Sequence, residues 1–140
     1  MPAWMKRISL WGGALAVVLA AGLIKPIGPD PASARDVTRS DIKILQGSLL
    51  AYYTEYAKSP PAGHAATIAA LRGANPRQIV FLDPKSDRLN ANGEYLDVWG
   101  TAFSIDISDP ESPRVYSFGK DKRDQHGSPD SDDIASWHQG

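Results

Sequence analysis

The 140-residue chain contains no cysteine. This absence excludes a disulfide framework, a thiolate metal site, a cysteine nucleophile and a lipid-attachment cysteine. The chain also lacks an excess of positive charge, because 15 Lys and Arg stand against 16 Asp and Glu for a net charge of −1. Without a basic stripe, the composition argues against nucleic acid as a partner.

Catalytic motifs are scarce as well. The three histidines, His64, His126 and His138, do not stand at a metal-ligand spacing such as H-E-x-x-H, and we interpret each as a surface histidine. No G-x-S-x-G elbow and no glycine-rich phosphate loop occurs. Asp97, beside Trp99, is interpreted as a turn-forming residue rather than a catalytic acid. The sequence therefore predicts a protein that is not an enzyme.

One uncharged run stands out near the N-terminus. Residues 8–24 read ISLWGGALAVVLAAGLI and follow Lys6 and Arg7. The run lies at the short end of the roughly 17 to 25 residues that span a bilayer, and the basic residues ahead of it place that end in the cytoplasm. Run length favours an anchor, which predicts a single-pass inner-membrane protein with its C-terminal domain in the periplasm.

The alternative is a cleaved signal peptide. Its basic start and apolar run are followed by a small-residue site, Ala32-Ser33-Ala34, so cleavage would leave a free periplasmic or secreted protein. Both interpretations give the same division of the chain. Residues 1–34 form an anchor or signal segment with a proline-rich linker, and residues 35–140 form one domain, since this length suits a single core.

The domain is predicted to begin with a helix. From Ala34 to about Tyr56 the apolar residues recur at three- and four-residue steps, which is the period of an amphipathic helix. We expect Gly47, inside this segment, to permit close packing against a neighbour. A second, shorter helix is predicted from Ala65 to Arg72, with Gly73 placed to end it.

Short strands are predicted after the helices. The runs 78–82, 102–107 and 114–118 are rich in strand-forming residues, and the second alternates Phe103, Ile105 and Ile107 with polar residues. Helices first and short antiparallel strands after them predict an α+β fold, with a long N-terminal helix packed on a small antiparallel sheet.

The last quarter of the chain carries an acidic loop. After the strand that begins at Val115, the chain turns at Gly119 and runs polar before Ile134 and Trp137 return it to the core. Such a segment buries little apolar surface of its own. A hard cation such as Ca²⁺, which takes about six to eight oxygen ligands, would hold it, and the alternative is a solvated acidic loop.

Several motifs carry a family resemblance. LDVWGTAFSI (96–105), VYSFGKD (115–121) and DDIASW (132–137) resemble the C-terminal half of the major pseudopilin of bacterial type II secretion, and residues 41–61 resemble the long helix of that family. The resemblance implies a pseudopilin-like subunit of a type II secretion or pilus-like assembly. Its partners would be other pseudopilin or secretion-system proteins, including copies of itself.

The resemblance also implies a calcium site, because the C-terminal loop of that family binds calcium. Carried over by position, Asp121, Asp132 and Asp133 would be the side-chain ligands, with the carbonyl of Phe118 and one near Asp130 completing the shell.

This sequence departs from the family pattern in several places. Val98 replaces the usual proline, Lys122 replaces a glycine, and residues 8–24 lack the prepilin-peptidase motif with its glutamate. Lys120, Lys122 and Arg123 place positive charge beside the proposed cation, which weakens binding. The resemblance therefore implies a pseudopilin-like domain on a plain anchor or signal.

Overall fold

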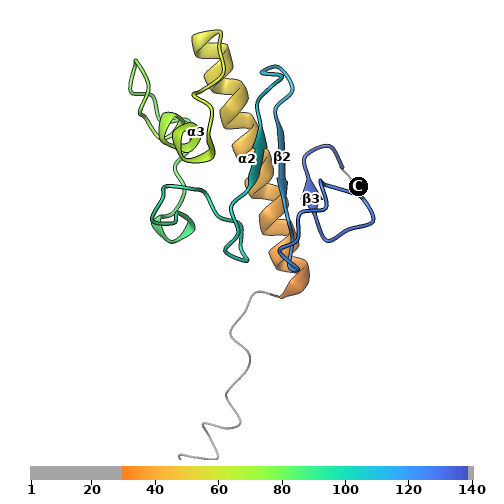
Figure 1. The fold of residues 1–140 in the computed structure, drawn as a ribbon. Helices are drawn as coiled ribbons and strands as arrows, with labels where there is room; N and C mark the ends of the chain where they lie inside the picture. Colours follow the sequence, from red (N-terminus) through yellow and green to blue (C-terminus); the bar gives the residue numbers. More distant parts are fainter. Residues whose placement is uncertain (1–29, 139–140) are drawn as a thin grey trace, which may run out of the picture. The chain divides into compact units, whose positions relative to one another are not determined.

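The structure is a computed structural model that describes residues 30–138, and the predicted apolar run 8–24 lies outside the described residues. From Pro31 onward the chain forms one compact unit. Its elements are α2 (Pro31–Tyr56), α3 (His64–Leu71), the short 3₁₀-helix η1 (Ser86–Arg88), β1 (Ser104–Asp106), β2 (Arg114–Ser117) and β3 (Ile134–Ala135), as Figure 1 shows.

Helix α2 begins three residues before the predicted start. Pro31 occupies its first position, where a fixed φ and a missing amide donor cost nothing. The predicted cleavage site Ala32-Ser33-Ala34 therefore lies in the first turn of the helix, and Ala34 is buried. A chain cut after Ala34 would lack this turn.

The core lies between α2, α3 and the sheet. Its buried apolar residues come from α2, α3, β2, β3 and the segments that join the elements, and they include Ile42, Leu45, Leu49, Tyr52, Ile68, Leu71, Phe103, Val115 and Ile134. The predicted helical spacing of α2 is confirmed, because its three- and four-residue steps place one face in this core. Helix α3 ends at Leu71, one residue before the predicted Arg72, which is its C-cap, and Gly73 follows at a φ of 117°, as expected of a glycine that ends a helix.

The sheet is antiparallel and has the strand order β1-β2-β3. Helix α2 packs on β2 and β3, so it covers one face of the sheet. Along β2, Val115 and Ser117 are buried, whereas Arg114 is exposed on the opposite face. The prediction of an α+β fold with a helix packed on a small antiparallel sheet is confirmed.

Two local predictions are wrong. The run 78–82 is not a strand, because it extends over the end of α3 and the amides of Phe81 and Leu82 donate to the carbonyl of Leu71 (2.8 and 3.1 Å). Gly47 is exposed, and a Cβ added there would meet nothing within 4 Å, so it serves no close packing within the described residues.

Membrane-spanning helices are absent from the described part of the chain. Over residues 30–138, no helix is both long enough and apolar enough to cross a bilayer.

Candidate functional site

The candidate site is the loop that leaves β2 and returns as β3. Its two ends lie in direct backbone contact at Gly119, where the φ is 75°. A Cβ at this position would lie 2.7 Å from the carbonyl carbon of Asp132 and closer still to its oxygen. Only glycine combines this φ with this approach, so Gly119 is the residue that lets the loop close.

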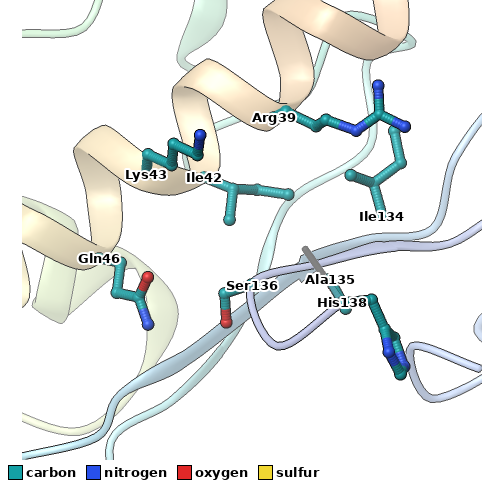
Figure 2. Close-up of a pocket in the computed structure, with 8 residues that line it drawn as sticks. All are labelled: Arg39, Ile42, Lys43, Gln46, Ile134, Ala135, Ser136 and His138. Carbon is teal, nitrogen blue, oxygen red and sulfur yellow. The ribbon is translucent and has the colours of Figure 1, made fainter. Parts of the chain in front are cut away.

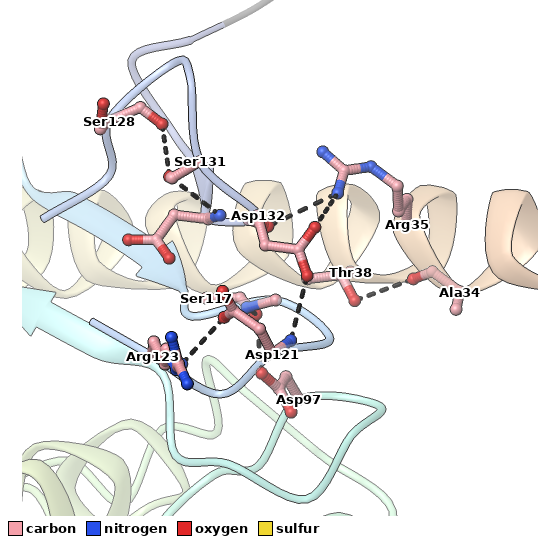
Figure 3. A network of polar contacts seen from close by, with 12 residues as sticks. Ala34, Arg35, Thr38, Asp97, Ser117, Asp121, Arg123, Ser128, Ser131 and Asp132 are labelled. Atoms are coloured by element: carbon pink, nitrogen blue, oxygen red, sulfur yellow. Dashed lines mark hydrogen bonds and ion pairs between the residues drawn. The ribbon is translucent and has the colours of Figure 1, made fainter. Parts of the chain in front are cut away.

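Asp132 joins the two ends of the loop to helix α2. Its Oδ2 accepts a hydrogen bond from the amide of Asp121 (3.0 Å), and its carbonyl oxygen accepts one from Nη1 of Arg35 (3.5 Å), as Figure 3 shows. The Arg35 guanidinium also lies 3.8 Å from Oδ1. Both side chains are more than a third exposed, so this ion pair orients the loop and adds little stability.

Asp133 is the buried acid of the loop, with only 7% of its surface exposed. Its Oδ2 accepts hydrogen bonds from the amides of Gln125 (3.0 Å) and Gly127 (2.8 Å). Its Oδ1 has no hydrogen-bond partner, and no other buried side-chain oxygen or nitrogen in residues 30–138 shares that condition. Leaving such an atom unpaired costs about 1–3 kcal/mol of folding free energy. A cation or a hydrogen-bond donor that paired with this oxygen would therefore stabilise the fold.

The other predicted ligands, Asp121, Asp130 and Phe118, are less buried than Asp133. Asp121 is exposed, and its Oδ1 accepts a hydrogen bond from the amide of Arg123 (2.9 Å). Asp130 is exposed at the outer turn of the loop, and Phe118 is half-buried with its ring 5.7 Å from that of Tyr116.

The carboxylates are not gathered into one ligand group. No three His, Cys, Asp or Glu side chains in the described part of the chain are placed to hold a metal ion together. The structure thus links Asp121 to Asp132 through a hydrogen bond from the Asp121 amide to the Asp132 carboxylate, and it buries Asp133 separately.

An aromatic cluster covers the loop from the outer face of the sheet. Trp137 lies against Gly127, where an added Cβ would be 2.8 Å from Cη2 of the indole. The guanidinium of Arg114 lies 4.1 Å from the centre of the Trp137 ring, and the ring of Tyr116 lies 5.6 Å from it. Ile134 returns the chain to the core as expected, but the same expectation for Trp137 is wrong, because Trp137 is half-buried against Arg114, Tyr116 and Gly127 and is not part of the core.

Tyr116 also ties the acidic segment to the sheet, a role that sequence reasoning missed. Its hydroxyl donates to Oδ1 of Asp124 (2.8 Å), which also accepts the amide of His126 (2.9 Å). The amide of His126 and the Tyr116 hydroxyl lower the pKa of Asp124, whereas burial raises the pKa of Tyr116. Asp124 therefore holds the loop as a charged acceptor at neutral pH.

A buried polar network supports the start of the loop. Asp97 is 2% exposed; its Oδ1 accepts the amides of Trp99 and Thr101 (3.0 Å each), and its Oδ2 accepts the hydroxyl of Ser117 (2.7 Å). The oxygen of Ser117 in turn accepts the amide of Gly119 (3.0 Å). The prediction of a turn-forming Asp97 is confirmed, but nothing in the sequence pattern indicated its link to Ser117.

One histidine prediction is wrong. His64 is half-buried, and its Nε2 accepts the amide of Tyr95 (3.0 Å). Burial lowers the pKa of His64, so the neutral imidazole is the form that fits this position. His126 and His138 are exposed, as predicted.

Comparison with known proteins gives no relative. No family model matches the chain, and neither a curated protein nor a solved structure matches it. The pseudopilin resemblance therefore stays a prediction.

Proposed function

We propose that the chain is a non-enzymatic, pseudopilin-like subunit of a type II secretion or pilus-like assembly. Its domain lies outside the inner membrane, residues 8–24 anchor it there, and calcium stabilises its C-terminal loop. The observation that carries the calcium part is the buried, unpartnered Oδ1 of Asp133.

Calcium suits the oxygen donors of this loop. Asp133 offers a buried carboxylate oxygen without a partner, and Asp121 and Asp132 approach each other at the mouth of the loop. These three carboxylates do not converge in the described part of the chain, so for them to hold the ion with the carbonyl of Phe118 and one near Asp130, the loop would have to draw them together. Bound calcium would neutralise the acidic loop and join segments that have no apolar core of their own.

The surface of α2 supports the assembly part. Val37 and Ile44 lie two helical turns apart on one side of the helix, and they are 40% and 53% exposed. Apolar side chains in this arrangement would be covered by a helix of another subunit. The proposed partners are other pseudopilin or secretion-system proteins, including further copies of this chain.

Site-directed cross-linking in bacterial cells tests the assembly. Because the chain has no cysteine, an Ile44→Cys variant carries a single reactive thiol. We expect oxidation to give disulfide-linked dimers in the membrane fraction. The matched control is Lys85→Cys, which is exposed but lies outside α2 and should stay monomeric.

Two outcomes would contradict the proposal. Equal cross-linking of both variants would show random collision rather than assembly through α2. A soluble periplasmic monomer whose intact mass begins at Arg35 would instead establish the free, cleaved module.

A further inference from the structure

A small pocket lies between α2 and β3, away from the acidic loop contacts described above. Its volume is about 70 Å³. Figure 2 shows Ile42 from the helix and Ile134 and Ala135 from the strand lining it, with Arg39 and Lys43 above them on the helix. The pocket therefore combines an apolar floor with a basic rim.

The charges around the pocket have one sign. Among residues 30–138, no acidic side chain lines it, and the two cations Arg39 and Lys43 project from successive turns of α2. Arg39 already forms an ion pair with Asp36, whose Oδ1 lies 3.0 Å from Nη1 of Arg39. Lys43 has no ion pair with any residue between 30 and 138. An anionic occupant would thus gain an unshared ammonium partner.

Gln46, Ser136 and His138 complete the polar side of the pocket. Nε2 of Gln46 donates to the carbonyl oxygen of Pro113 (2.9 Å), which fixes that side chain across the pocket wall. The oxygen of Ser136 accepts the amide of Val115 (3.1 Å), so its hydroxyl hydrogen remains able to donate. The pocket offers an anion a hydroxyl donor in addition to the cations.

The size of the pocket limits the occupant. About 10–15 Å³ of such volume is enough for one water molecule, so the pocket holds several. The pocket is well below the roughly 300–1,000 Å³ of small-molecule sites, so it suits a carboxyl group with one or two methylenes better than a nucleotide or a cofactor ring system. The chemistry and the volume together describe the side chain of Asp or Glu.

We propose that this pocket receives an aspartate or glutamate side chain of a partner protein. The methylene stem packs on Ile42, Ile134 and Ala135, and the carboxylate lies between Lys43 and Arg39. The inference rests on the proposed function only in taking the partner to be a protein, and it requires neither calcium nor the exposed face around Ile44.

Titration with short peptides tests the pocket. The probe is N-acetyl-Leu-Glu-Gly-amide, added to the ¹⁵N-labelled full chain in the presence of chelator. We expect saturable shifts of the Ile42 and Ser136 amide signals at millimolar peptide. The same peptide with Gln in place of Glu should bind the parent protein at least about tenfold more weakly. The Glu peptide should bind a Lys43→Glu variant more weakly by the same factor. In both cases about 1.4 kcal/mol of ionic attraction is lost.

Lys58→Glu is the matched control, since Lys58 is exposed just beyond the end of the same helix and lines no part of the pocket. This variant should bind the Glu peptide as the parent does. Three results would overturn the proposal: no saturable shift, equal binding of the Gln peptide, or undiminished binding to the Lys43→Glu variant. Acetate binding as tightly as the peptide would also overturn it, because the pocket would then serve a free carboxylate.

The two proposals fail in different ways. Cross-linking through Ile44 without peptide binding would reject the pocket and leave the assembly in place. Peptide binding without cross-linking would reject the assembly through α2 and leave the pocket in place.

Discussion

Replacing Gly119 with alanine tests the geometry that closes the acidic loop. At a φ of 75°, any residue other than glycine carries a penalty of about 1–2 kcal/mol. The added Cβ would also overlap the carbonyl of Asp132, whose carbon lies only 2.7 Å away. Forced overlap in a packed region costs about 1–3 kcal/mol more. The expected loss in the free energy of unfolding is therefore about 3 kcal/mol.

Such a loss is measurable by urea and thermal unfolding. For a domain of this size, about 1 kcal/mol corresponds to roughly 4–8 °C in Tm, so the variant should melt at least about 10 °C below the parent. The contact at Asp132 is backbone, which has no flexible end to move aside. The loop must shift as a whole, and the bond from the Asp121 amide to Asp132 should be lost with it.

A matched glycine in the same chain gives the opposite prediction. Gly47 lies in α2, and a Cβ there meets nothing within 4 Å, so Gly47→Ala should stabilise the protein by about 0.5–1 kcal/mol through helix propensity. If Gly119→Ala left the Tm unchanged, or if both variants shifted it in the same direction, the closed geometry of the loop would be refuted.

Three further predictions concern the scaffold. Burial lowers the pKa of His64, so its neutral form stabilises the fold fully above about pH 6.5. This contribution to the free energy of unfolding is lost as the pH falls below that value toward the folded pKa. His64→Gln, which keeps an acceptor for the amide of Tyr95, should remove that part of the pH dependence when urea unfolding is measured at each pH. Asp97→Ala leaves the Ser117 hydroxyl and two amides without their charged acceptor and should cost about 3 kcal/mol by the same assay. Leu45→Ala, at a fully buried position, should lower the free energy of unfolding by about 3 kcal/mol in a thermal melt.

Each of these predictions has a result that contradicts it. An unchanged pH profile in His64→Gln would mean that His64 is not held neutral. A loss below about 0.5 kcal/mol in Asp97→Ala would mean that water satisfies the network. A similarly small loss in Leu45→Ala would place that residue outside the core.

The sequence predicted those parts of the fold that local periodicity specifies. The three- and four-residue spacing of α2 determines which face meets the core, and the alternation around Ile105 predicts that its half-buried side chain packs against the core. The run 78–82 could not be told from a strand, because an apolar extended segment has the same pattern whether it pairs with a strand or lies over the end of a helix. Its partner, the carbonyl of Leu71, is a tertiary contact.

The candidate site was predictable as a segment but not as a geometry. The clustered aspartates marked the loop, and Gly119 marked its turn. The bond from Ser117 to Asp97 and the contact of Arg35 with Asp132 join residues far apart in the sequence, so composition and spacing carry no signal for them. The burial of Asp133, in contrast to exposed Asp121, follows from packing around the loop and not from residue type.

The calcium dependence of unfolding tests the central claim most directly. Thermal melts of the chain should be compared in calcium and in chelator, for the parent and for Asp133→Asn, which can still accept the amides of Gln125 and Gly127 but lacks the charge. At calcium one hundred times above its Kd the parent should gain about 2.7 kcal/mol, or roughly 10–20 °C in Tm, and the variant should gain nothing. An identical Tm of the parent in calcium and in chelator, or an equal calcium shift in Asp133→Asn, would contradict the account.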